Sequence, residues 1–253
     1  MGTKKTLFIT LFVLCMAFCL NISSLSYAAR NDIQSNTRTA ILESFGNQPL
    51  LFIQNDGQLD KKVKYYEKGA NHATYFTENG IYLNLFRQKN TPGVTTDFLH
   101  LSFVNAKAKP LITSEGILPT KYNYYIGNDP AKWREGISTY KTIKYTEIYE
   151  NIDLKIYGNN RQLEYDVIVK PGGDPAAVKF KYEGAESLAV NAGGELEIKL
   201  NHGTIIQKSP SLYQDISGQR VKVPGSFKLL SDNRYTFEIA SYDTEKPMPA
   251  IPF

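Results

Sequence analysis

The chain has 253 residues, of which 42% are hydrophobic and 12% aromatic, and its formal net charge is +4 at pH 7. No basic run or basic helix stands out, which argues against a protein that binds nucleic acid or a membrane surface by charge. Both cysteines, Cys15 and Cys19, lie in an N-terminal apolar run. Removal of that run leaves no cysteine, which excludes disulfides, thiolate metal sites and a cysteine nucleophile in the processed chain.

The N-terminus has the layout of a secretory signal peptide. Lys4 and Lys5 precede an apolar run from Leu7 to Leu20, and small residues follow in the segment from Ser26 to Ala28. The run is too short for a comfortable membrane span and polar residues follow it, so a retained anchor is the less favoured alternative. We therefore expect residues 1–28 to be a signal peptide, with no stable membrane insertion after cleavage. The expected location is secreted or at the cell surface, with the periplasm as an alternative.

The remaining chain, about 225 residues long, can form one large β-domain or two small ones. After a polar leader at 29–46, which we expect to be flexible, strand-like segments recur about every ten residues. The predicted strands are 50–54, 63–67, 73–77, 81–86, 98–104, 122–126, 143–149, 152–157, 162–169, 178–182, 188–190, 196–200, 205–208, 212–216, 220–223, 226–230 and 235–240. These short strands are rich in Tyr, Phe, Val and Ile, and no helical period is sustained. The pattern predicts an all-β fold, either one β-sandwich or two stacked antiparallel sandwich subdomains.

A proline-bearing stretch from Lys109 to Pro119 suggests a division between two halves. The expected organisation is an N-terminal β-meander subdomain at 47–110, a main β-sandwich subdomain at 111–246 and a short tail at 247–253. The meander prediction depends on turn residues between its strands, among them Asn79-Gly80, which is a strong hairpin signal.

The most regular piece of sheet is a hairpin formed by 152–157 and 162–169. Asparagine tolerates the positive φ of a type I′ turn, so Asn159 and Asn160 are predicted at its tip. The predicted inward face is apolar and consists of Ile152, Leu154, Ile156, Leu163, Tyr165, Val167 and Val169. In this register Asp153 lies opposite Asp166, a like-charge pair that destabilises a sheet unless something neutralises it.

Four stretches together resemble a family of bacterial secreted proteins. They are FIQNDGQ at Phe52–Gln58, YNYYIGNDPAKW at Tyr122–Trp133, IYENIDLKIYGNNRQLEYDVIVKPGGDP at Ile148–Pro175 and PSLYQ at Pro210–Gln214. The resemblance spans nearly the whole processed chain. It implies a β-rich N-terminal domain with no established function, which in that family commonly precedes an array of β-propeller-type repeats. It implies no catalytic residues.

Related chains continue into the repeats, whereas this sequence ends at Phe253, soon after Tyr242-Asp243. Two interpretations stay open. Either the domain acts alone, or the chain is a truncated or split product of a longer repeat protein.

Three carboxylates of the hairpin, Asp153, Glu164 and Asp166, share its outward face in the predicted register. Paired carboxylates are what a cation site or a glycoside hydrolase uses. The favoured alternative is a solvated face on which Arg161, Lys155 or a lysine of a neighbouring strand neutralises the charge. No calcium-loop spacing occurs in the sequence, so we expect no metal and no cofactor.

Aromatic residues are the second set of candidates. Tyr124 or Tyr125, Tyr157 and Trp133 are hypothetical sugar-binding residues, because planar side chains on a β-surface stack on sugar rings. Packing within the core or along a sheet edge is the more common role of such residues. The three histidines, which lack metal-ligand spacing, are expected to be ordinary strand or surface residues: His72, His100 and His202.

No nucleophile elbow, Walker loop or dinucleotide fingerprint is present. The leading prediction is therefore a secreted, non-enzymatic β module for binding or assembly at the bacterial cell surface or outside it. Its expected partner is a cell-surface protein or polysaccharide and not nucleic acid. The first alternative is a carbohydrate-binding module that uses surface tyrosines. The second is a carboxylate-based glycoside hydrolase.

Overall fold

The computed structural model describes residues 50–88, 94–159, 162–216 and 218–244. The predicted signal peptide at 1–28, the leader at 29–46 and the tail at 247–253 lie outside these residues. No helix in the described ranges is long and apolar enough to cross a membrane.

The described residues form strands and two short 3₁₀ helices, which confirms the all-β prediction. The strands are β1 (Phe52–Gln54), β2 (Val63–Lys68), β3 (His72–Thr77), β4 (Gly80–Gln88), β5 (Val94–Phe103), β6 (Leu111–Tyr124), β7 (Arg134–Tyr149), β8 (Ile152–Asn159), β9 (Gln162–Val169), β10 (Phe180–Glu183), β11 (Ser187–Val190), β12 (Leu196–Leu200), β13 (Gly203–Gln207), β14 (Leu212–Ile216), β15 (Gln219–Val223), β16 (Gly225–Leu230) and β17 (Arg234–Ile239). The 3₁₀ helices are η1 (Pro130–Lys132) and η2 (Pro175–Ala177).

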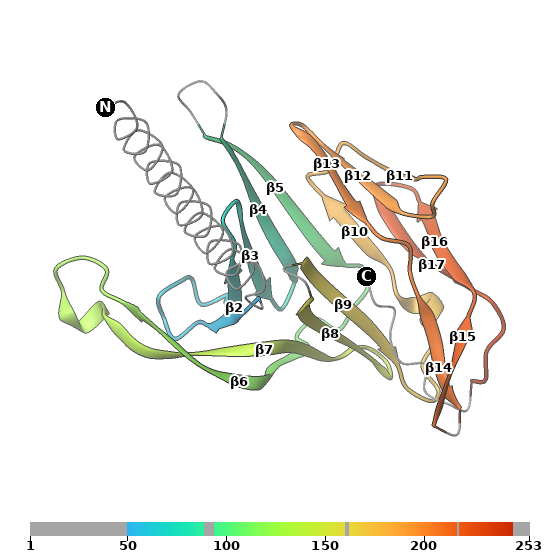
Figure 1. Ribbon diagram of the computed structural model, residues 1–253, viewed down its shortest axis with the longest axis horizontal. Coiled ribbons are helices and arrows are strands. Elements are labelled where there is room, and N and C mark those ends of the chain that lie inside the picture. Colours follow the sequence, from blue (N-terminus) through green and yellow to red (C-terminus); the bar gives the residue numbers. More distant parts are fainter. Residues whose placement is uncertain (1–49, 89–93, 160–161, 217, 245–253) are drawn as a thin grey trace, which may run out of the picture. The chain divides into compact units, whose positions relative to one another are not determined.

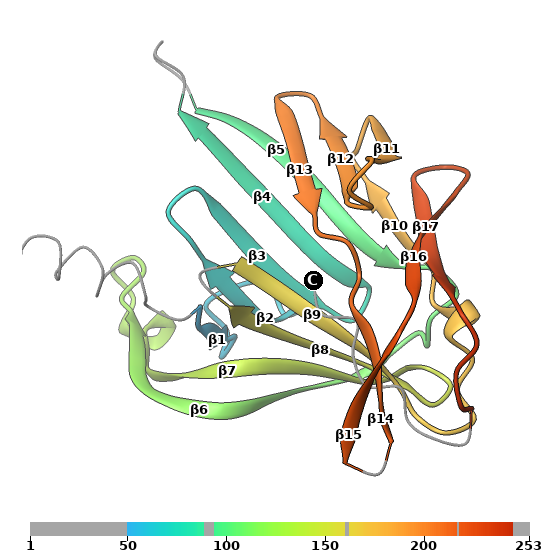
Figure 2. The same ribbon diagram turned by 45° about the vertical axis from the view of Figure 1, so that its right-hand side comes forward.

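Among the described residues, twelve strands make one antiparallel sheet (Figure 1). Its strand order is β16-β17-β10-β5-β4-β3-β2-β1-β7-β8-β9, and β6 pairs with β7. A three-stranded sheet, β11-β12-β13, and the pair β14-β15 are separate from it (Figure 2).

The long sheet folds over its own apolar face. The hydroxyls of Tyr165 on β9 and Tyr235 on β17 lie 2.8 Å apart, although these strands stand near opposite ends of the strand order. The Tyr165 ring also meets the ring of Phe180 on β10 edge-to-face. The two layers of the sandwich-like fold therefore belong largely to one sheet. The core between them also includes buried side chains from β12 and β14, such as Ile198 and Leu212. Removal of these apolar side chains from water is the main contribution to the stability of the fold.

The boundary between two subdomains that was expected near residue 110 falls within this sheet. Hydrogen-bonded pairs β1–β7 and β5–β10 join strands from both sides of that position. The stretch expected to separate the halves is itself a strand, β6, with Pro119 inside it. The pairing of β6 with β7 shifts register between Leu118 and Lys121, and an irregularity on an edge strand is where a proline is tolerated.

The hairpin β8–β9 has the predicted inward face but a different register. The side chains expected inside are buried or partly buried. However, Asp153 pairs with Ile168, and Asp166 pairs with Lys155. The prediction of an Asp153–Asp166 pair is therefore wrong. The observed register is offset by two residues from the predicted one, because Asp153 pairs with Ile168 instead of Asp166. An offset of two changes every pairing partner but keeps each side chain on the same face of the sheet. Asn160, predicted at the tip of the turn, lies outside the described residues.

Candidate functional site

The structure places Asp153 in a buried ion-pair cluster. Its side chain is about 2% exposed and accepts hydrogen bonds from Lys170 Nζ at 2.7 Å and the Glu147 backbone N–H at 2.8 Å. Lys144 Nζ lies 3.1 Å from the second carboxylate oxygen. Burial alone would raise the pKa of Asp153, but these donors outweigh it and lower the pKa. The expected neutralisation by a neighbouring lysine is therefore present, whereas the expected solvated surface is not.

The other two predicted carboxylates and Tyr157 stay together on β8 and β9. The Tyr157 hydroxyl donates to Asp166 Oδ1 at 2.9 Å, and Asn159 donates to Glu164 at 3.0 Å. Burial raises the pKa of Asp166, although the Tyr157 bond and the Lys155 charge oppose the rise. The polar end of Tyr157 is thus engaged by its own hairpin.

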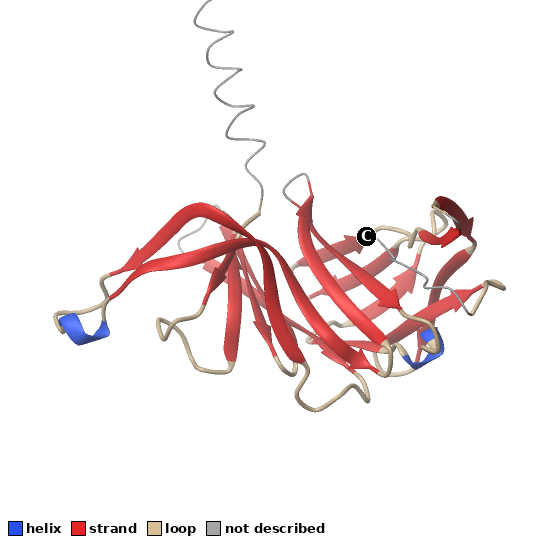
Figure 3. Cartoon of the chain, turned by 90° about the horizontal axis from the view of Figure 1, so that it is seen from below, coloured by secondary structure: helices blue, strands red, loops and turns tan. Residues whose placement is uncertain are grey.

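The remaining predicted aromatic residues lie on the long β6–β7 hairpin, whose far end carries η1 (Figure 3). There Tyr125 and Trp133, both exposed, meet edge-to-face with ring centroids 5.3 Å apart. Tyr124 instead packs against the second buried cluster and accepts a hydrogen bond from Tyr66. The predicted aromatic candidates therefore do not form one site.

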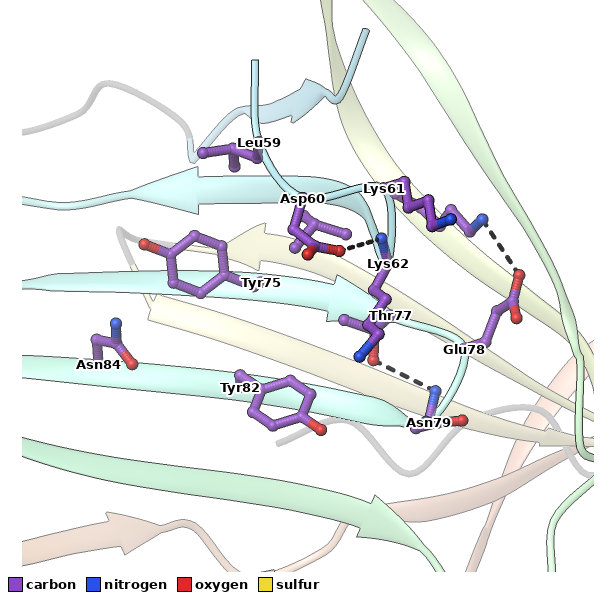
Figure 4. Close-up of a pocket in the computed structure, with 12 residues that line it drawn as sticks. Leu59, Asp60, Lys61, Lys62, Tyr75, Thr77, Glu78, Asn79, Tyr82 and Asn84 are labelled. Carbon is purple, nitrogen blue, oxygen red and sulfur yellow. Dashed lines mark hydrogen bonds and ion pairs between the residues drawn. The ribbon is translucent and has the colours of Figure 1, made fainter. Parts of the chain in front are cut away.

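A groove with a volume of about 860 Å³ lies elsewhere, over β2, β3 and β4. Figure 4 shows the side chains that line it. The lining residues are Leu59, Asp60, Lys61, Lys62, Val63, Lys64, Tyr75, Thr77, Glu78, Asn79, Tyr82 and Asn84. They come from the β1–β2 loop, from three adjacent strands and from the β3–β4 turn.

Two groove residues, Tyr75 and Tyr82, belong to a cross-strand row of aromatic residues. Tyr66 on β2, Tyr75 on β3, Tyr82 on β4 and His100 on β5 are consecutive partners in the sheet register. Residues directly opposite each other share a face, and their alternate neighbours face the core. The Tyr82 ring is stacked on His100 with centroids 3.9 Å apart, and 38% of Tyr82 remains exposed.

His100 is held in turn by polar groups beside the groove. Its Nδ1 lies 3.2 Å from Glu183 Oε2, and its Nε2 lies 3.3 Å from the Asn79 carbonyl oxygen. Ser102 donates to the other Glu183 oxygen at 2.9 Å. Burial opposes ionisation of Glu183, but the bonds from His100 and Ser102 outweigh it and lower the Glu183 pKa. This network fixes the ring on which Tyr82 stacks.

The loop side of the groove is charged. Lys64 pairs with Glu78 at 3.2 Å, and Asp60 Oδ1 accepts the backbone N–H of Lys62 at 2.8 Å. Neither Lys61 nor Lys62 forms an ion pair through its ammonium group with another described residue. In Figure 4 the Lys62 side chain extends from the loop over the sheet in the direction of Thr77. The groove thus has an aromatic floor and a cationic edge.

None of the groove residues was among the binding or catalytic candidates predicted from the sequence. A usable signal was present in the hairpin at Asn79-Gly80, because pairing Thr77 with Gly80 puts Tyr75 opposite Tyr82. The loop lysines gave no comparable signal, since a charged loop is ordinary. Within the described ranges, no group of three His, Cys, Asp or Glu residues could hold a metal ion.

The chain is an all-β protein with a bent antiparallel sheet and a surface groove lined in part by two tyrosines. Residues 52–249 match the family described as "Domain of unknown function (DUF7948)", and the chain belongs to that family. Comparisons with curated proteins and with solved structures found no match.

Proposed function

We propose that this chain is a non-enzymatic binding module that works outside the cell and binds carbohydrate in the groove over β2, β3 and β4. The observation that carries the proposal is the outward-facing pair Tyr75 and Tyr82 within that groove. Stacking of sugars on surface tyrosines is also what the sequence suggested. The residues proposed here are Tyr75 and Tyr82, whereas the sequence pointed to Tyr157 and Trp133.

The groove offers both kinds of contact that a sugar needs. The partly exposed tyrosine rings can present apolar faces to the C–H groups of a pyranose, while Asn79 and Asn84 supply amide donors and acceptors for its hydroxyls. Stacking on His100 holds the Tyr82 ring in one orientation. A ring held before binding loses little conformational freedom when a ligand arrives, which favours affinity.

A role without catalysis is supported by the state of the groove carboxylates. Glu78 is paired with Lys64, and Asp60 is engaged by the backbone of its own loop. Hydrolysis of a glycosidic bond uses two carboxyl groups that flank the bond as acid and base or nucleophile. The hairpin carboxylate of Asp153 forms ion pairs with two lysines and is similarly unsuited to act as a catalytic acid, base or nucleophile.

An extracellular location is supported by the signal-like N-terminus and by the resemblance to N-terminal domains of secreted repeat proteins. Under this proposal the module contributes binding or assembly at the cell surface, where polysaccharides are abundant ligands.

Affinity electrophoresis of the exported chain through gels containing different polysaccharides tests the proposal. At least one polysaccharide should retard the protein, and Tyr82→Ala should weaken that interaction about tenfold, as expected for one lost aromatic contact. Tyr157→Ala is the matched control and should bind normally, because Tyr157 lies outside the groove. Absence of retardation on every polysaccharide, or release of sugar fragments, would contradict the proposal.

A further inference from the structure

We infer that the groove is selective for an acidic polysaccharide whose sugar rings carry carboxylates, that is, a polyuronate. The inference rests on the proposed function and adds the charge of the ligand. Its basis is the position of Lys61, Lys62 and Lys64 along one edge of a groove whose floor carries Tyr75 and Tyr82.

The charges of the groove do not cancel within it. Its lining has three lysines and two carboxylates. One lysine, Lys64, is matched by Glu78. Asp60 accepts a backbone N–H from Lys62 and has no ion pair shorter than 4 Å with either loop ammonium group. Lys61 and Lys62 therefore present ammonium groups that an anionic ligand can pair with.

The arrangement matches a sugar acid better than a neutral sugar. Adjacent strands are about 4.8 Å apart, so the floor from β2 to β4 spans about 10 Å and accommodates more than one sugar ring. A uronate places its carboxylate at the ring edge, while the ring face remains free to stack. A ring over Tyr75 or Tyr82 can then direct its carboxylate to Lys61 or Lys62 on the loop side.

A nucleic acid also combines rings with negative charge, but the molecule does not fit that ligand. The whole chain has a formal charge of only +4, and the groove holds carboxylates of Asp60 and Glu78 beside its lysines. Binding of a phosphate backbone uses many cationic contacts along the strand. A polyuronate with one carboxylate per ring needs fewer of them.

The test compares polygalacturonate with its fully methyl-esterified form, which has the same rings without the charge. Isothermal titration with the exported chain should give at least about fivefold tighter binding to the charged polymer, and this difference should shrink as salt is raised. The double variant Lys61→Gln/Lys62→Gln should lose most of the difference. The double variant Lys208→Gln/Lys222→Gln, which removes two exposed lysines outside the groove, should retain it.

Equal binding of both polymers, or no effect of the Lys61→Gln/Lys62→Gln variant, would overturn the inference while leaving carbohydrate binding intact. Tighter binding of a thymidine homopolymer than of polygalacturonate would also overturn it, in favour of a nucleic-acid ligand. If neither polymer nor any other polysaccharide binds, the proposed function fails as well. Tyr82→Ala distinguishes a loss of charge selectivity from a loss of carbohydrate binding, because it should weaken binding to both the charged and the esterified polymer.

Discussion

Replacing Asp153 with asparagine should destabilise the fold, although the new side chain has nearly the same shape. In the native protein, Lys144 and Lys170 both point at this carboxylate, which is almost completely buried. Asparagine removes the negative charge and leaves two cations facing a neutral amide. A like-charge pair of Asp153 with Asp166, as the sequence register predicted, would give the opposite sign, because removing one charge would relieve repulsion.

The size of the effect follows from the burial of the three partners. Removing one member of a fully buried ion pair costs about 3–5 kcal/mol. Here the side chains of Lys144 and Lys170 are 30% and 37% exposed, so water can partly rehydrate their ammonium groups. We therefore expect Asp153→Asn to lower the free energy of unfolding by about 2 kcal/mol. For a unit of this size that corresponds to a decrease in Tm of about 4–8 °C.

The effect should also depend on pH. The folded-state pKa of Asp153 lies below its ordinary value of 3.8, so its stabilising contribution is present above that value and is lost as pH falls through the folded pKa. Thermal unfolding followed by circular dichroism should show the full difference between wild type and Asp153→Asn at pH 7 and a smaller one at pH 3. Glu150→Gln, which changes an exposed neighbour, is the control and should change Tm little. An unchanged or raised Tm for Asp153→Asn would refute the ion-pair account.

Two further substitutions test one half-buried and one buried polar side chain. The hydrogen bond to Glu67 raises the pKa of His72 above 6.5 despite the opposing effect of burial, so its contribution is present below pH 6.5 and is lost as pH rises through the folded pKa. His72→Gln should therefore flatten the dependence of Tm on pH above about 6.5, and a profile identical to wild type would contradict this. Gln207 accepts from Tyr182 and donates to Tyr165 within the core. Gln207→Leu should cost about 2–4 kcal/mol in urea unfolding, because two buried hydroxyls lose their amide partner, and a loss under 0.5 kcal/mol would show that the network contributes little.

The strands were predictable from the sequence because their apolar residues alternate and their turns contain Gly, Asn and Asp. The inward face of the β8–β9 hairpin was also predictable. Its register was not, since Gly158-Asn159-Asn160-Arg161 allows the two-residue turn at more than one position with the same side-chain faces. The resulting error gave Asp153 the wrong partner and obscured its pairing with Lys144 and Lys170.

The other differences between prediction and structure arise from pairing between strands that are far apart in the sequence. Nothing local to Phe52–Gln54 indicates that it pairs with β7. The predicted strand 122–126 covers only the end of β6, because Pro119 argued against a strand before it and its place at a register shift is visible only in the sheet. The groove was missed for the same reason. It combines a hairpin face with the loop around Lys61 and Lys62, and these segments meet only after β2 and β3 have paired.

The most direct test of the proposed binding site is an NMR titration of the isotope-labelled chain without residues 1–28, using a galacturonate oligosaccharide as ligand. Chemical-shift changes should concentrate at the backbone amides of Lys61, Lys62, Tyr75 and Tyr82, and the amides of Tyr157 and Trp133 should be unaffected. Changes centred on the β8–β9 hairpin or on the far end of β6–β7, with the groove residues unmoved, would contradict it.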